Sequence, residues 1–157
     1  MALTIREQCS ARVLAVIDAV AGVTAVRPRR VFWADDVTGD LTAVVRQGEM
    51  RFEHEDADGA TGTLVCAQDY TVTLAVIESD EATATYEIEG NRVMAEIIEA
   101  LAADPDLNGA ADYEGVRLVG VTPLDEEIRQ SYRLSGETLH LTVTFVTGRT
   151  NMETNRR

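Results

Sequence analysis

The segment 138–145, TLHLTVTF, constrains the fold of this chain more than any other stretch. Apolar side chains alternate there with polar ones, so one face carries Leu139, Leu141, Val143 and Phe145. This period of two is typical of a β-strand that is covered on one face only. The pattern predicts a strand over residues 138–147 in a sheet with helices packed on one side.

Two segments have the apolar spacing of amphipathic helices. The first covers residues 4–21, with Thr4 as the expected N-cap and Gly22 as the expected C-cap. The second ends before Pro105, because the residue preceding a proline disfavours helical geometry. Its buried stripe is expected to consist of Val93, Met94, Ile97, Ile98 and Leu101. The polar interval 79–91 precedes it, and the start of this helix is left open around Gly90.

The remaining apolar runs predict strands. They cover residues 26–33, 41–46, 50–55, 64–78 and 116–124. Pro28 favours an edge position for the first of them, and Gly48 separates the second from the third. A chain of 157 residues fits one domain. We therefore predict a single α+β domain over residues 1–148, followed by a flexible polar tail over 149–157. The domain combines a mainly antiparallel or mixed sheet, two helices on one face and an extended hairpin.

The charge of the chain is strongly acidic. Its 27 acidic residues outnumber 14 basic residues, all of them arginine, which gives a formal net charge of -13. Such a balance argues against a nucleic-acid ligand, because cations drive that binding. No apolar run approaches the roughly 20 residues of a membrane span, and the charged N-terminal segment is a poor secretory signal. We expect a protein that resides in a cytoplasm and has no membrane partner.

No segment has the pattern of a catalytic or cofactor site. The stretch EHEDADG around His54 lacks the ligand spacing of a calcium loop, and His140 lies on the polar face of a strand. Neither histidine has a serine in a recognisable nucleophile setting, and no phosphate-binding glycine motif is present. Cys9 and Cys66 are expected to be buried, reduced thiols. We predict no enzymatic activity, no metal and no cofactor.

Two charged segments are candidates for subunit or partner contacts. Arginine suits paired contacts with the carboxylates of a neighbouring chain. The first segment, RPRR, carries Arg27, Arg29 and Arg30. The second carries Asp125, Glu126, Glu127, Arg129 and Arg133, in what the sequence presents as a loop or a strand extension. If copies associate through the first segment, reversing the charge of Arg29 and Arg30 is expected to weaken assembly.

Four blocks, in this order, resemble the tail-terminator proteins of long-tailed bacteriophages, of the minor tail protein U type, and their tail-completion and neck relatives. They are a helix ending AVAGV, then LTAVVRQGE, then YTVTLAVIE leading into VMAEIIEALAADPDLNGAA, and finally LTVTFVT. The segment EALAADPDLNG, residues 99–109, fits the family's short link from the second helix to the next strand. Two features depart from the family pattern: the long interval 79–91 and the RPRR segment.

The resemblance implies a structural virion protein of the tail-neck region, assembled in the host cytoplasm. Such a protein forms a ring, typically a hexamer, on the last ring of the tail tube protein. It ends tube growth, contacts the head-completion protein and lets DNA pass without binding it. Six copies would carry 6 × -13, or -78, formal charges, and an acidic lumen would repel the duplex. The acidic hairpin tip, with Glu53, Glu55, Asp56 and Asp58, is then a candidate lumen or tube contact.

Two alternatives stay open at the level of sequence. One is a neighbouring neck or head-tail joining protein, which the four blocks do not separate from a terminator. The other belongs to a different class: an acidic interaction protein that mimics DNA, supported by the net charge of -13.

Overall fold

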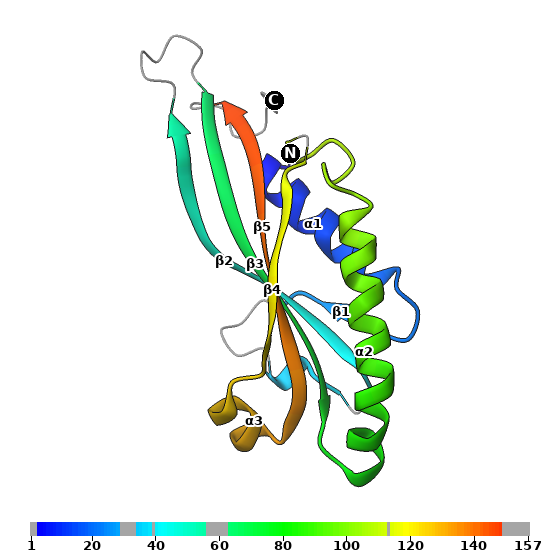
Figure 1. The fold of residues 1–157 in the computed structure, drawn as a ribbon. Helices are drawn as coiled ribbons and strands as arrows, with labels where there is room; N and C mark the ends of the chain where they lie inside the picture. The colour runs from blue at the N-terminus through cyan, green and yellow to red at the C-terminus, as the bar shows by residue number, and fades with distance from the viewer. Residues whose placement is uncertain (1–2, 29–33, 39, 56–62, 113, 149–157) are drawn as a thin grey trace.

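The computed structural model describes residues 3–28, 34–38, 40–55, 63–112 and 114–148 (Figure 1). In chain order its elements are α1 (Ile5–Asp18), β1 (Thr24–Val26), the short helix η1 (Ala34–Asp36), β2 (Thr42–Glu55), β3 (Thr63–Ile77), α2 (Asp80–Ala102), β4 (Val116–Pro123), α3 (Glu126–Tyr132) and β5 (Leu134–Gly148). The prediction of an α+β domain is confirmed. The predicted tail, residues 149–157, lies outside the described residues.

One five-stranded mixed sheet organises the fold. Its strand order is β1-β2-β3-β5-β4, so β1 and β4 are the two edges. β1 runs parallel to β2, and every other neighbouring pair is antiparallel. The central pair, β3 and β5, stays in register from Thr63 opposite Gly148 to Ile77 opposite Leu134.

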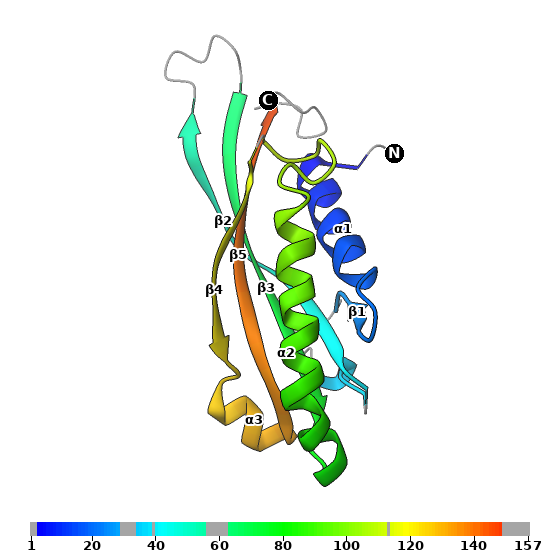
Figure 2. The ribbon, with the colours of Figure 1, turned by 45° about the vertical axis from the view of Figure 1, so that its right-hand side comes forward.

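The main core lies between the sheet and the helices α1 and α2, which cover one face side by side (Figures 1 and 2). The four apolar residues of the 138–145 segment are all buried in it, as their alternation predicts. The predicted helical stripe is also confirmed, with Val93, Met94, Ile97 and Leu101 buried and Ile98 partly buried. The prediction that two helices pack on one face of the sheet is therefore confirmed.

A second, smaller core lies on the opposite face, at one end of the sheet. It consists of Val37, Val44, Ala75, Leu124 and Leu134, with Val26, Ala34 and Ile128 packed against it. Ile128 belongs to α3, so this third helix lies on the side of the sheet away from α1 and α2 (Figure 1). The sequence did not predict α3: its segment was expected to be a loop or a strand extension.

Of the two caps predicted for α1, the N-cap is correct and the C-cap is wrong. Thr4 is the N-cap, and its side chain accepts a hydrogen bond from the Glu7 amide. Gly22 is not the C-cap, because the helix ends at Asp18 with Ala19 as its cap. Gly22 instead has a φ of 88° in the following turn, a conformation that glycine adopts at no steric cost.

The strand boundaries near the N-terminus differ from the prediction. Of the expected strand 26–33, only Val26 is in β1, while residues 27–28 follow it as irregular chain and 29–33 lie outside the described residues. The predicted edge position of this strand is correct. The expected strands 41–46 and 50–55 are one strand, β2, whose pairing shifts between Gln47 and Met50. Gly48 therefore lies in a β-bulge, which bends a strand without ending it.

The polar interval 79–91 is also different from the prediction. It forms the first half of α2, and Gly90 lies inside the helix, with the ring of Tyr86 beside its Cα. Only Glu78 and Ser79 separate β3 from this helix. At its other end α2 stops at Ala102, close to the end that Pro105 predicts.

Candidate functional site

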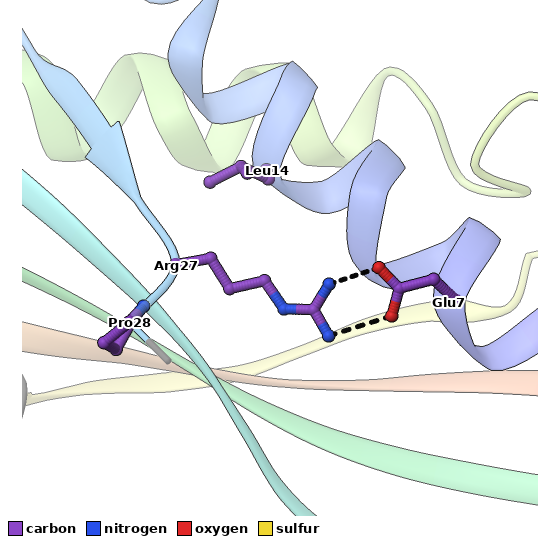
Figure 3. Close-up of a pocket in the computed structure, with 4 residues that line it drawn as sticks. All are labelled: Glu7, Leu14, Arg27 and Pro28. Atoms are coloured by element: carbon purple, nitrogen blue, oxygen red, sulfur yellow. Dashed lines mark hydrogen bonds and ion pairs between the residues drawn. The ribbon is translucent and has the colours of Figure 1, made fainter. Parts of the chain in front are cut away.

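The first predicted contact residue, Arg27, already has a partner within the chain. Its guanidinium donates to both carboxylate oxygens of Glu7 on α1, at 2.5 and 3.0 Å (Figure 3). The hydrogen bond from Arg27 holds the pKa of Glu7 below its usual range. Leu14 and Pro28 complete an open groove of about 600 Å³ around this pair. Arg27 thus ties the chain after β1 to α1, while Arg29 and Arg30 lie outside the described residues.

The second predicted contact segment is the helix α3. Asp125 is its N-cap and accepts from the amides of Glu127 and Ile128, while Glu126 accepts from the Gln130 side chain. Arg129 is exposed, and Arg133 is a left-handed C-cap with a φ of 52°. An Asp followed by two acidic residues is the usual start of a helix, so this signal was present in the sequence. The structure brings this segment and η1 together in the second core.

The acidic hairpin is described only in part. Glu53 lies on β2, half exposed, with a carboxylate oxygen 3.6 Å from the Arg51 guanidinium. Glu55 is the last residue of β2. Asp56 and Asp58, which the sequence places at the hairpin tip, lie outside the described residues.

A buried polar network, which the sequence did not predict, holds the β2 bulge. Gln68 on β3 is fully buried, and its amide nitrogen donates to the carbonyls of Gly48, Glu49 and Asp69 at 2.9, 3.3 and 2.9 Å. Its amide oxygen accepts from Arg6 of α1 at 2.7 Å. Gln68 therefore satisfies the carbonyls that the bulge removes from the strand pairing, and it links the bulge to the first helix.

A second part of this network surrounds Ser10. The Ser10 and Tyr70 hydroxyls lie 2.7 Å apart, Gln47 donates to Ser10 at 2.6 Å, and Ser10 donates to the Arg6 carbonyl. Burial raises the pKa of Tyr70 to about 12, so at neutral pH its hydroxyl keeps its proton and offers no base. The arrangement fastens α1 to the sheet through Ser10.

Cys9, Cys66 and His140 lie where the sequence predicts, the thiols in the interior and the imidazole on the polar face of its strand. Cys9 and Cys66 are both buried and free, and burial raises the pKa of the Cys9 thiol to about 12. The His140 ring lies 2.8 Å from the Thr122 hydroxyl on the face of the sheet opposite α1 and α2. Among the described residues, no group of three or more His, Cys, Asp or Glu side chains is placed to hold a metal ion.

The face of the sheet opposite α1 and α2 carries many polar side chains. We call this polar part the open sheet face and define it by Arg46, Arg51, Asp69, Thr71, Thr73, Arg117, Thr122, Thr138, His140, Thr142 and Thr144. Polar contacts cross its strands. The Arg51 guanidinium donates to both oxygens of Asp69, at 2.6 and 3.0 Å, Thr142 donates to Asp69 at 2.8 Å, and the hydroxyls of Thr73 and Thr138 lie 3.1 Å apart. The hydrogen bond from Arg51 lowers the pKa of Asp69.

Within the described ranges, no helix has the length and apolarity that a membrane span requires. A scan against protein-family models matches none of them to this chain, and no curated protein matches it either.

Proposed function

We propose that this chain is a structural protein of a long-tailed phage, a terminator that caps the tail tube as a ring, with a hexamer as the expected assembly. In this role it stops addition of the tail tube protein and gives the head-completion protein a surface on which to dock. DNA passes through its lumen without specific binding. The protein is then a virion component of the tail-neck region, without catalytic residues or cofactor.

The order of the elements carries this proposal. Each of the four family-like blocks falls on one element or on one junction: α1, β2, the passage from β3 into α2, and β5. As a connection between elements, the interval 79–91 would depart from the family pattern. Because this interval is helical, the long strand leads into the second helix with two residues between them. One of the two departures is thereby reduced, and the RPRR segment remains the other.

The chemistry of the side that carries α1 and α2 is compatible with the wall of a passive ring. A wall that lets a duplex slide must not hold phosphates, since each paired cation adds salt-dependent affinity. The net charge of -13 supplies repulsion instead. Of the arginines near α1, Arg12 and Arg27 are each paired with a carboxylate of the same chain.

Tail tubes provide the test. Tubes assembled from the tail tube protein of the same phage are mixed with the purified protein and then supplied with further tube subunits. We expect density at one end of each tube in electron micrographs, and tubes that stop lengthening. Tubes that keep growing with bare ends at saturating protein would overturn the proposal. Binding to the neck proteins with no binding to tube ends would instead assign the chain to the neighbouring joining proteins.

A further inference from the structure

Four arginines in the described part of the chain have no acceptor within it. Arg12, Arg27, Arg51 and Arg92 are in ion pairs, and Arg6 donates to Gln68. The side chains of the other four described arginines form no hydrogen bond or ion pair with any described residue. These four are Arg46, Arg117, Arg129 and Arg133. A guanidinium without a carboxylate is notable in a chain with 27 acidic residues.

All four arginines belong to one side of the molecule. In the strand register, Arg46 lies opposite Thr71 and Arg117 lies opposite Thr142. The residues on either side of these positions along each strand face the main core. Both arginines therefore point to the open sheet face. Arg129 lies on α3 and Arg133 caps it, and this helix packs on the same side through Ile128. α3 carries three acids, Asp125, Glu126 and Glu127, beside its two arginines, so the unpaired positive charge that we use is that of Arg46 and Arg117 on the open sheet face.

The opposite side of the molecule presents carboxylates. The outer face of α2, as we use the term, consists of Glu87, Ile88, Glu89, Arg92, Glu96 and Glu99. Ile88 is 74% exposed, which marks this face as turned away from the core. Arg92 contacts Glu89 and Glu96, at 3.0 and 2.9 Å. This face thus carries four carboxylates and one guanidinium, and Glu87 and Glu99 have no ion pair among the described residues.

We propose that copies of this chain associate head to tail, with the open sheet face of one copy against the outer face of α2 in the next. A second copy is the occupant because the two complementary surfaces lie on opposite sides of the sheet in the same molecule (Figures 1 and 2). A contact between two different surfaces generates a ring when its rotation closes. The inference rests on the proposed function for its role as the ring contact, but the contact is measured without tail tubes.

Self-association in solution is the first measurement, by light scattering and chemical cross-linking. Wild-type protein is expected to assemble at an ionic strength of about 0.05 M and to assemble less at about 0.5 M, because salt screens the charge pairs. Arg46→Glu with Arg117→Glu is expected to raise the concentration for half-assembly at least about tenfold. Glu87→Arg with Glu99→Arg is expected to do the same from the other surface.

Mixing the two variants is the sharper test. Each reversed surface meets its complement only on the other variant, so an equal mixture is expected to regain assembly that neither protein shows alone. This recovery also demonstrates that both variants are folded. Arg156→Glu with Arg157→Glu is the charge-matched control, since it also moves the formal charge from -13 to -17, and it is expected to assemble like the wild type.

Three results would overturn the contact: a monomeric wild type at low salt, variants that assemble normally alone, or a mixture that stays apart. If the wild type stays monomeric yet binds duplex DNA through Arg46 and Arg117, nucleic acid is the occupant instead. Rings that form as expected but fail to stop tube growth would support the contact while refuting the terminator function.

Discussion

At the scale of single residues, the stability of this fold depends on a few buried polar side chains. Gln68 has the most demanding position, because it is fully buried between three carbonyls and the Arg6 guanidinium. A buried carbonyl that loses its donor has no water to replace it.

Replacing Gln68 with leucine is expected to lower the free energy of unfolding by about 1–3 kcal/mol, since it leaves the bulge carbonyls without a donor. Urea denaturation measures the change. Gln130→Leu is the matched control: it removes an amide from an exposed position on α3, and its effect is expected to stay within about 0.5 kcal/mol. A Gln68→Leu protein as stable as the wild type would show that the network does not support the bulge.

The pair between Arg27 and Glu7 predicts a dependence of stability on pH. Arg27 lowers the pKa of Glu7 in the folded state, so the pair stabilises the fold above the ordinary value of 4.5. That stability is lost as the pH falls through the lowered pKa. Because the Glu7 side chain is 39% exposed, solvent screens the pair and its contribution is below about 1 kcal/mol.

The measurement compares Glu7→Gln with the wild type by urea denaturation across acidic pH. The variant is expected to be less stable near neutral pH, and the difference is expected to vanish as the pH falls through the lowered pKa of Glu7, because the protonated wild-type side chain then also lacks the charge. Glu99→Gln, which removes an exposed carboxylate without an ion pair among the described residues, is expected to show no such convergence. If the stability difference between Glu7→Gln and the wild type stays the same in acid, the pair between Arg27 and Glu7 is not its cause.

At the scale of elements, close contact between β3 and β5 holds the sheet together. A Cβ on Gly136 of β5 would lie 2.4 Å from the Leu74 carbonyl oxygen and 3.0 Å from the Ala75 Cα. These are backbone atoms, which cannot move without disturbing the strand pairing. A Cβ on Gly120, in the edge strand β4, would meet no atom within 4 Å.

Gly136→Ala is therefore expected to cost about 1–3 kcal/mol in the free energy of unfolding, as overpacking typically does. Gly120→Ala makes the same chemical change in a strand and is expected to stay within about 0.5 kcal/mol of the wild type. Thermal or urea unfolding of the two variants checks the difference. Equal stabilities would mean that β3 and β5 separate at Gly136 without cost.

Sequence periodicity predicted the elements whose apolar faces pack into the main core. It failed where the packing of a segment depends on a side chain that its own apolar pattern does not include. The stripe of α2 continues towards its N-terminus through Tyr86, but Gly90 interrupts it in the sequence. In the fold the Tyr86 ring lies over Gly90, where a Cβ would be 2.8 Å from the ring, so the face is filled after all. α3 was missed because its apolar anchor, Ile128, packs with residues as distant as Val37.

The candidate sites were less predictable than the elements. Arg27 was expected to meet a neighbouring chain, yet its partner Glu7 lies 20 positions earlier on α1. Only the fold brings them together, since no local pattern pairs these two segments. The open sheet face has a clearer sequence signal, because alternation in β5 places His140 and Thr142 opposite the core. Alternation within β5 could not predict that β2 and β4 add Arg46 and Arg117 to the same face.

At the scale of the whole molecule, the two sides of the sheet differ in chemistry. α1 and α2 lie on one side of the sheet and α3 on the other (Figure 2). The first side carries the carboxylates of the outer face of α2, and the second carries the open sheet face. A subunit with different surfaces on its two sides is suited to head-to-tail association. Such association generates a ring only when its rotation closes, and the terminator proposal requires that closure.

The most direct test of the terminator proposal is to follow tail tube growth by electron microscopy with this protein present from the start. The proposal predicts tubes that carry a ring at one end and do not lengthen when tube subunits are added. Removing this protein from the same reaction is expected to restore growth. Tubes that reach the same lengths with bare ends, with and without the protein, would contradict the proposal.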